Sequence, residues 1–238
     1  METISQNLGF SLVILCYRAE ESIIKFANKA NELISKISSN YEIVLVGNYV
    51  DGSNDKTKDI VNQLATENPI FKAITKPKQG MMGWDMREGL NAASGEYICV
   101  IDGDGQFPLE SIEKCFELIK TGNYDLVKTY RSTRNDGAYR RTISFVYNIL
   151  FDILFPKLGS RDVNSKPKMM KKSSYQKMSL RSDDWFIDAE IMINVKKLGM
   201  KIHEFPVEFK ELEGRKSFVK FSAIFEFIRN LINYRLNY

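Results

Sequence analysis

Short apolar runs alternate with longer segments of helical periodicity through the first part of the chain. The apolar runs have the length and composition of buried strands, and they cover residues 10–17, 42–46, 71–75 and 97–101. Between the first two runs, residues 20–37 repeat apolar side chains at the i, i+3, i+4, i+7 spacing of an amphipathic helix. Two further helical segments separate the later runs. This alternation predicts an α/β fold with a Rossmann-like central sheet, built mostly from parallel strands and flanked by helices.

The pattern is less regular in the second half of the chain. Pro108 is expected to open a helix through Lys120, because its missing N–H costs nothing in a first turn. The remaining predicted elements are a strand at 124–129, an apolar helix around 142–155, a basic loop at 157–172, a helix that starts in the acidic patch 183–190, and a strand near 202–209. No shift in composition marks a linker, so we predict one domain over residues 1–215 and a C-terminal amphipathic helix over 216–238.

The composition is that of a globular protein. The chain has 238 residues, of which 44% are apolar, so one domain can bury a sizeable core. Charges of both signs are interspersed and the net charge is only +4, so we expect no nucleic-acid partner. The three cysteines, Cys16, Cys99 and Cys115, lack the C-x-x-C spacing of a zinc or redox site, and we expect them to be reduced and buried.

Neither a secretory signal nor a membrane span is visible in the sequence. The first ten residues lack a basic segment followed by a long apolar one. Asp152 interrupts the apolar run at 143–155, and Glu226 and Arg229 interrupt the C-terminal run, so no stretch reaches the roughly 18 residues that a spanning helix needs. We therefore expect a cytoplasmic protein, with peripheral contact to the cytoplasmic membrane face left open.

A pair of acids stands at the end of the fourth predicted strand. Asp102 and Asp104 are separated by a glycine and followed by Gly105 and Gln106. Ligands of an open parallel sheet bind at the carboxyl ends of its strands, and two converging carboxylates suit Mg²⁺ or Mn²⁺ that bridges phosphate oxygens. An ordinary Asp-Gly turn is the alternative. A calcium loop is disfavoured, because Phe107 stands at the sixth position, where glycine is required.

The segment around these acids resembles a known family. Residues 83–108 read GWDMREGLNAASGEYICVIDGDGQFP. This run is similar to the helix, A-x-G-[DE] turn, strand and D-x-D-x-Q-x-P run of the family 2 glycosyltransferases, in particular the dolichol-phosphate mannosyltransferase-like branch that glycosylates polyprenyl phosphates. The resemblance implies a GT-A fold, with Asp102 near the ribose and diphosphate of a nucleotide sugar. It also implies that Asp102, Asp104 and Gln106 form the metal site and that Asp104 acts in catalysis by holding the metal.

Weaker similarity extends from residue 10 to about 217, with two departures in the segments that hold the nucleotide. The family's Y-N-E after the first strand is replaced by YRAE at 17–20, and its V-D-D-G-S is replaced by GNYVDGS at 47–53. The second acid of the latter motif matches Asp51. The resemblance therefore implies that Tyr17, Asp51, Lys78 and Asp102 bind the nucleotide sugar, while the identity of the base stays open.

Basic residues follow the fifth predicted strand. Arginine forks are suited to bidentate contact with phosphate, although a solvated basic face explains such a cluster equally well. The resemblance implies that Arg131, Arg141, Ser144 and Lys168 contact an anionic lipid acceptor or the donor diphosphate.

The acidic patch offers a candidate base. Asp188 and Glu190 resemble the family's D-x-E at the start of a helix. If the acceptor is a hydroxyl, Asp188 is the carboxylate we expect to position it and take its proton. The alternative is a helix start, where acids are favoured by the dipole. His203, the only histidine, has no nearby partners for a triad or a metal site, and we expect it to be structural.

The C-terminal helix repeats apolar residues at helical spacing and carries Lys216, Lys220 and Arg229. Such a helix can lie on an anionic membrane surface, as a lipid acceptor would require. It can equally pack on the catalytic domain or on a second copy of the chain, which leaves a homodimer open.

We hypothesise an inverting, metal-dependent transfer of a sugar from a nucleoside diphosphate donor to a polyprenyl phosphate or a glycan hydroxyl. Sugar-nucleotide synthesis is disfavoured, because the G-x-G-T-R loop of that class is absent after the first strand. A non-catalytic sugar-nucleotide-binding or scaffold protein derived from a transferase is the alternative that the two altered segments keep open.

Overall fold

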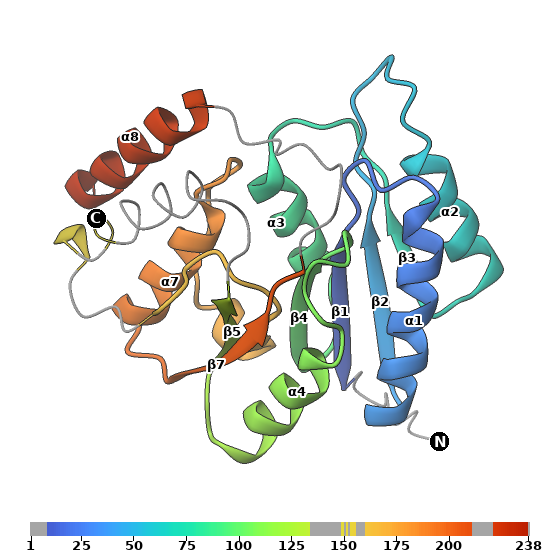
Figure 1. Cartoon of the computed structure of the whole chain (residues 1–238), viewed down its shortest axis with the longest axis horizontal. Helices are drawn as coiled ribbons and strands as arrows, with labels where there is room; N and C mark the ends of the chain where they lie inside the picture. Colours follow the sequence, from blue (N-terminus) through green and yellow to red (C-terminus); the bar gives the residue numbers. More distant parts are fainter. Residues whose placement is uncertain are drawn as a thin grey trace, which may run out of the picture.

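The structure is a computed structural model that describes residues 9–133, 149, 151, 153–155, 160–210 and 221–237 (Figure 1). The first half contains β1 (Phe10–Leu15), α1 (Ser22–Ile37), β2 (Tyr41–Val46), α2 (Thr57–Glu67), β3 (Phe71–Ile74), α3 (Met82–Ala92) and β4 (Tyr97–Asp102). The second half contains α4 (Ser111–Thr121), β5 (Leu126–Thr133), β6 (Lys168–Lys171), α6 (Lys172–Tyr175), α7 (Ile187–Lys197), β7 (Ile202–Glu208) and α8 (Phe221–Asn237). The α/β class and the predicted order of the first seven elements are confirmed.

Within the described residues the strands form a seven-stranded sheet in the order β3-β2-β1-β4-β6-β5-β7. The first four strands in this order are parallel, β6 is antiparallel to both of its neighbours, and β7 is parallel to β5. The chain first builds the sheet from β1 toward β3 and then returns to place β4 on the other side of β1. The direction of winding therefore reverses between β1 and β4, and a ligand crevice is expected at their carboxyl ends.

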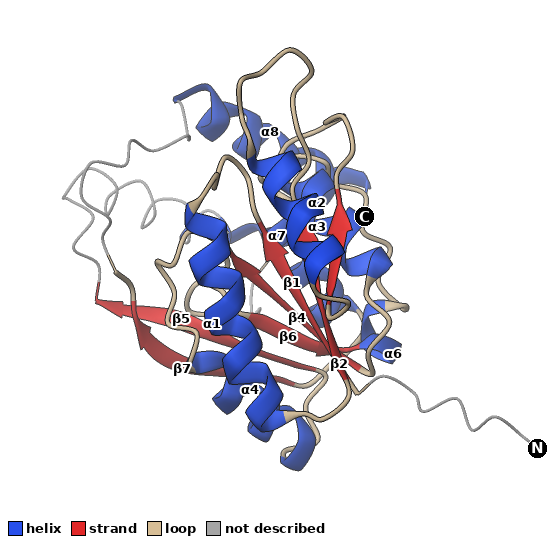
Figure 2. Ribbon diagram, turned by 90° about the vertical axis from the view of Figure 1, so that its right-hand side faces the viewer, coloured by secondary structure: helices blue, strands red, loops and turns tan. Residues whose placement is uncertain are grey.

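Helices cover both faces of this sheet (Figure 2). On one face α1, α2 and α4 pack around Leu12 and Ile14 of β1, and on the other α3 and α7 pack around Val13 and Leu15. Alternate residues of a strand point to opposite faces, so a strand covered on both sides must be apolar throughout. This requirement explains the continuous apolar runs from which the strands were predicted.

Several predicted boundaries differ from the structure by a few residues, and two of these differences are informative. The basic loop predicted at 157–172 is wrong in its last part, because Lys168–Lys171 form β6 between β4 and β5. The lysine at each end of this strand favoured the prediction of an exposed loop. In the structure Lys168 is fully buried beside Asp188 of α7. Helix α4 begins at Ser111 rather than at Pro108, whose carbonyl accepts the Ser111 N–H at 3.2 Å.

The C-terminal helix α8 packs on α7 through one side. Leu231 is buried in a cluster with Phe155, Phe186 and Met192. The Tyr234 hydroxyl lies 3.3 Å from the Asn194 amide nitrogen of α7. In the described parts of the chain no helix has the length and apolar character needed to cross a membrane. The division at residue 215 stays a prediction.

Helix α3 lies unusually close to β1 and β2 at Gly89. A Cβ atom added there would lie 2.7 Å from Cγ2 of Val46 and closer still to Cγ1 of Val13. Both neighbours are β-branched core residues with little freedom to move. The sheet therefore requires glycine at this helix position.

We predict that Gly89→Ala lowers the free energy of unfolding by about 1–3 kcal/mol through overpacking. An unhindered helical glycine would instead gain about 0.5–1 kcal/mol from the same change, so the sign is diagnostic. Urea denaturation measures the difference, with Thr66→Ala at an exposed position of α2 as the control. A stabilised Gly89→Ala protein would contradict the described packing of α3.

Candidate active site at the carboxyl ends of β1 and β4

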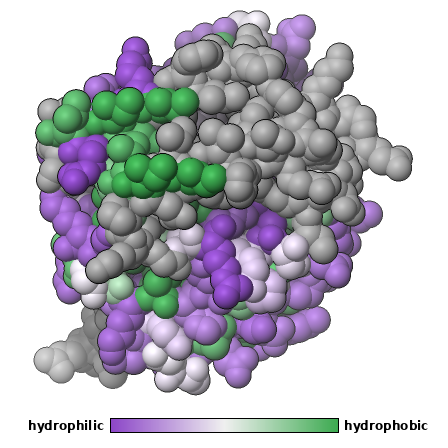
Figure 3. All heavy atoms as spheres, turned by 60° about the vertical axis from the view of Figure 1, so that its left-hand side comes forward, coloured by the Kyte–Doolittle hydropathy of each residue, from purple (hydrophilic) through white to green (hydrophobic). Residues whose placement is uncertain are grey.

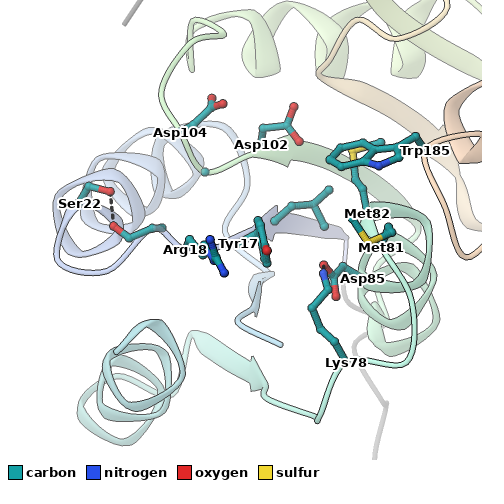
Figure 4. Close-up of a pocket in the computed structure, with 13 residues that line it drawn as sticks. Tyr17, Arg18, Ser22, Lys78, Met81, Met82, Asp85, Asp102, Asp104 and Trp185 are labelled. Atoms are coloured by element: carbon teal, nitrogen blue, oxygen red, sulfur yellow. Dashed lines mark hydrogen bonds and ion pairs between the residues drawn. The ribbon is translucent and has the colours of Figure 1, made fainter. Parts of the chain in front are cut away.

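A cavity of about 440 Å³ opens where the winding of the sheet reverses (Figure 4). Residues from β1, the β1–α1 connection, the start of α1, the β3–α3 connection, α3, β4, the turn after β4 and the loop before α7 line it. They are Leu15, Tyr17, Arg18, Ala19, Ser22, Lys78, Met81, Met82, Asp85, Asp102, Gly103, Asp104 and Trp185. The two acids of the predicted motif and two of the predicted nucleotide-binding residues, Tyr17 and Lys78, thus lie around one space.

The turn after β4 presents the two acids at the cavity. The Gly103 N–H donates to the Leu15 carbonyl at 2.9 Å, which extends the pairing of β1 and β4 past the strand ends. A Cβ at Gly103 would lie 3.0 Å from Ile14 and Ile23, so this close approach needs glycine. The carboxylates of Asp102 and Asp104 point to the same side of the turn (Figure 4). They can therefore act on one ligand.

Gln106 lies behind the turn and does not line the cavity. Its side-chain amide donates to the Lys210 carbonyl at 3.2 Å, and its own carbonyl accepts the Lys210 N–H at 2.9 Å. The Gln106 N–H donates to Asp104 Oδ1 at 3.0 Å. In this structure Gln106 ties the acidic turn to the end of β7, and its role as a metal ligand stays a prediction.

A buried polar group lies at the opposite end of the cavity. Asp85 of α3 is paired with Lys78, and its Oδ1 accepts the Asn48 side-chain amide at 2.9 Å. Burial raises the pKa of the Asp85 carboxyl above its ordinary value, and the Lys78 ammonium opposes that rise. The Lys78 ammonium also lies 4.5 Å from the centre of the Tyr17 ring, a cation–π contact. This end of the cavity offers an aromatic face next to fixed charges.

The segment between β1 and α1 that departs from the family pattern is strained. Arg18 and Glu20 have φ angles of 50° and 46°, a left-handed conformation that costs energy for residues with a side chain. The Glu20 N–H donates to the Thr57 hydroxyl at 2.9 Å, and Asp55 accepts the Thr57 N–H at 3.0 Å. Contacts to the start of α2 therefore hold this strained segment at the cavity wall.

Asp51 lies apart from this arrangement. It is exposed in the turn after β2 and does not line the cavity. Asn48 and Asp85 are the buried polar residues near this region that sequence analysis missed. Their pairing depends on the packing of α3 beside the end of β2, and nothing in their local sequence indicates it.

A chain of charges runs from Asp102 into the core. Lys166 Nζ lies 3.4 Å from Asp102 Oδ2 and 3.2 Å from Asp188 Oδ2, and Lys168 Nζ lies 2.5 Å from Asp188 Oδ1. Burial alone would lower the pKa of Lys166, but the carboxylates of Asp102 and Asp188 raise it above its ordinary value. Burial lowers the pKa of Lys168 to about 8. The charge chain, defined as these four residues, joins the turn to β6 and α7.

Asp188 is a buried member of this chain. Its side chain is 1% exposed, and it makes no capping hydrogen bond at the start of α7. Burial would raise the pKa of Asp188, but Lys166 and Lys168 hold it below its ordinary value. Lys168, predicted to contact phosphate, is likewise fully buried. The catalytic role of Asp188 and the phosphate-binding role of Lys168 stay predictions, and their contacts favour a positioning role.

The loop before α7 carries Trp185 to the cavity. Glu190 accepts the backbone N–H groups of Arg181 and Ser182 at 3.0 and 2.9 Å. The Asp183 carbonyl accepts the Met81 N–H at 2.6 Å, at the start of α3. The second acid of the D-x-E pattern therefore anchors a wall of the cavity.

The predicted acceptor residues are only partly within the described residues. Arg131 Nε and a terminal guanidinium nitrogen donate to the two carboxylate oxygens of Asp162 at 2.6 and 2.9 Å. Arg141 and Ser144 lie outside the described residues. The fork of Arg131 is thus engaged with Asp162, and contact with an acceptor stays a prediction.

Comparison with known proteins decides the family. Residues 11–183, which include both sides of the cavity and the acidic turn, match the family described as glycosyl transferase family 2. The chain belongs to glycosyl transferase family 2. It is therefore a glycosyltransferase, and the predicted resemblance is confirmed.

The relatives of this family 2 glycosyltransferase lie in the predicted branch. It is 30% identical to a dolichyl-phosphate beta-glucosyltransferase of Trichomonas vaginalis over 240 residues, which covers 95% of the chain and 72% of that protein. It is 32% identical to an undecaprenyl-phosphate 4-deoxy-4-formamido-L-arabinose transferase of Photorhabdus laumondii over 142 residues, covering 59% of the chain and 42% of that protein.

The fold of this family 2 glycosyltransferase has known counterparts. The crystal structure of glucosyl-3-phosphoglycerate synthase from Mycobacterium tuberculosis, in complex with Mn²⁺, uridine diphosphate and phosphoglyceric acid, superimposes with a TM-score of 0.71 at 16% identity. The match covers 96% of the chain and 78% of that structure. The predicted GT-A fold is confirmed.

The acids of this glycosyltransferase that could hold a metal are Asp102 and Asp104. In the described residues no group of three or more His, Cys, Asp or Glu side chains converges to form a complete metal site. Two carboxylates are nevertheless the donor set expected for Mg²⁺ or Mn²⁺, because such ions commonly complete their coordination with substrate phosphates and water. The residues present fit an ion that binds together with a diphosphate.

Proposed function

We propose that this protein transfers a sugar from a nucleoside diphosphate donor to a polyprenyl phosphate, with Mg²⁺ or Mn²⁺ and with inversion at the anomeric carbon. The observation that carries the proposal is the pair of carboxylates beside a cavity at the reversal point of the sheet. Relatives named for transfer to dolichyl and undecaprenyl phosphate support the choice of acceptor.

The shape and chemistry of the cavity suit a nucleotide sugar. Its volume of about 440 Å³ lies within the ordinary range for small-molecule sites. Tyr17 and Lys78 offer an aromatic face and a cation at one end, where a base and its ribose would bind. Asp102 and Asp104 stand at the other end, where the diphosphate would bind.

The metal would be held by Asp102 and Asp104. When bound, it supplies positive charge that stabilises the departing nucleoside diphosphate. Gly103, between the two acids, lets the turn approach β1 closely. Trp185 and Met82 cover one side of the cavity and reduce the access of water, which would compete with the acceptor.

The surroundings of Asp188 favour a phosphate acceptor over a hydroxyl. A hydroxyl acceptor needs a base within hydrogen-bond reach. Asp188 is 1% exposed, and each of its carboxylate oxygens lies beside a lysine, which is a poor arrangement for collecting a proton. A phosphate acceptor is already ionised near neutral pH, so a direct, inverting displacement needs no such base.

A lipid acceptor requires contact with a membrane, and one face of the protein suits it. The side of the molecule that carries α8 shows two bands of apolar side chains (Figure 3). Among the described residues, Ile153 is 68% exposed and Leu236 is 77% exposed, and Ile149 and Ile232 are also exposed. Arg229 and Arg235 are exposed on α8 as well. We define these four apolar residues as the apolar face and propose that it rests on an anionic membrane surface.

Replacing Asp104 with Asn removes one of the two proposed metal ligands. We predict that it lowers metal-dependent release of nucleoside diphosphate by at least about a hundred-fold while the fold is retained. The assay uses a panel of nucleotide sugars with Mn²⁺ and a polyprenyl phosphate, and circular dichroism reports the fold.

Asp59→Asn, at an exposed position of α2, is the matched control and should keep full activity. Unchanged turnover by Asp104→Asn would contradict the assignment of the metal site. Failure of the unmodified protein to turn over any donor would instead favour a sugar-nucleotide-binding scaffold.

Introducing charge into the apolar face tests the membrane proposal. We predict that the double variant Ile153→Glu and Leu236→Glu binds vesicles containing anionic lipid at least about ten-fold more weakly, because two apolar side chains no longer insert. Co-sedimentation measures binding. The same change at Ile24 on α1, which is 39% exposed, is the control and should leave binding intact.

Equal vesicle binding by the double variant and the unmodified protein would contradict the proposal. A dimer in size-exclusion chromatography that the double variant converts to a monomer would assign the apolar face to a second copy of the chain instead.

A further inference from the structure

Lys166 is a buried cation directly behind one acid of the turn. Its side chain is 3% exposed, and its ammonium lies 3.4 Å from Asp102 Oδ2. It lies 3.2 Å from Asp188 Oδ2 on the other side. Lys166 does not line the cavity itself, whereas Asp102, which it contacts, does.

The position of Lys166 is fixed by its backbone. The Thr129 hydroxyl donates to the Lys166 carbonyl at 2.6 Å and lies 2.8 Å from the Ser165 hydroxyl. The Thr129 N–H donates to the Pro167 carbonyl at 3.3 Å. These contacts tie the segment before β6 to β5, and the ammonium of this anchored residue is buried between Asp102 and Asp188.

The two acids beside Lys166 differ in whether a second cation also neutralises them. Asp188 has a second cation, Lys168, 2.5 Å from its other oxygen, so this buried pair is neutral without Lys166. The charge of Lys166 is therefore offset chiefly by Asp102, whose side chain is 27% exposed. Asp102 thus serves as the counter-ion of a buried lysine as well as a proposed metal ligand.

We propose that Lys166 makes metal binding depend on the donor diphosphate. In the absence of a nucleotide, Lys166 holds the Asp102 carboxylate and repels a second cation from it. The negative charge of a diphosphate outweighs this repulsion, so metal and nucleotide bind together rather than metal alone. This inference rests on the proposed function, because it takes Asp102 as a residue of the metal site.

The physical basis is the strength of charge interactions in a partly buried place. Two like charges that share one carboxylate repel strongly where little water screens them. A diphosphate that neutralises the ion removes this cost. Coupling between two ligands is reciprocal, so a nucleotide that strengthens metal binding is itself strengthened by the metal by the same factor.

The test measures Mn²⁺ affinity of the full chain by electron paramagnetic resonance, without nucleotide and with saturating uridine or guanosine diphosphate. We expect Lys166→Met to bind Mn²⁺ alone about ten-fold more tightly than the unmodified protein. The strengthening of Mn²⁺ binding by the nucleotide should fall by the same factor. A residue that only supports the fold would instead weaken Mn²⁺ binding when replaced.

Three further variants sharpen the test. Lys166→Gln is a second neutral replacement that should behave like Lys166→Met, and it keeps the test usable if the first variant does not fold. Lys166→Arg retains the charge and should retain the coupling. Lys128→Met removes another fully buried lysine, paired with Glu204 at 2.8 Å and not with Asp102, and should leave Mn²⁺ binding unchanged.

The outcomes separate this inference from the proposed function. If the unmodified protein binds Mn²⁺ with a nucleotide but the neutral Lys166 variants bind Mn²⁺ alone no more tightly, the inference is overturned and the proposed metal site stands. If the unmodified protein binds no Mn²⁺ with any nucleoside diphosphate, both are overturned.

Discussion

The charge chain at the centre of the sheet is the interaction on which the site depends. Burying ions removes them from water at a high cost, which is offset only when each charge has a close partner. Lys166 and Lys168 enter the core where β6 begins, and Asp188 enters it from α7. Strand β6, which is antiparallel to β4, therefore lies beside β4 together with Asp188. The Asp188 carboxylate offsets the cost of burying Lys166 and Lys168. The charge chain ends at Asp102, which lines the cavity. The charges in the core and the charge at the cavity therefore interact directly.

The two ends of the cavity are built in different ways. The acidic turn rests on a close backbone approach, in which Gly103 extends the pairing of β1 with β4. The opposite end rests on side chains from separate elements, with Asn48 and Lys78 on either side of Asp85. The strained segment at Arg18 and Glu20 forms the part of the cavity wall between these two ends. This second end differs from the family pattern, and it is where the choice of base is expected to reside.

Much of the fold follows from patterns within single segments. Strands β1 to β4 were predictable because a strand covered on both faces must be apolar throughout. Helices α1 to α3 were predictable because a helix that packs on a sheet has apolar residues along one side. The acids Asp102 and Asp104 were predictable for a similar reason, because a strand end in a parallel sheet marks the ligand crevice. Strand β6 was not predictable from the sequence, because its lysines indicate an exposed loop. Only the fold places Asp188 beside them. Asp85 and Asn48 were missed because their pairing joins α3 to the end of β2 across 37 residues of sequence.

The central claim is that a metal and a nucleoside diphosphate bind together at the acidic turn. The most direct measurement is an anomalous difference map at the manganese edge, from crystals soaked with Mn²⁺ and whichever nucleoside diphosphate most raises the melting temperature. The account predicts an anomalous peak in contact with the Asp102 and Asp104 carboxylates and the diphosphate oxygens, with the base toward Tyr17. A nucleotide bound in the cavity with no manganese at these carboxylates, or bound elsewhere, would contradict it.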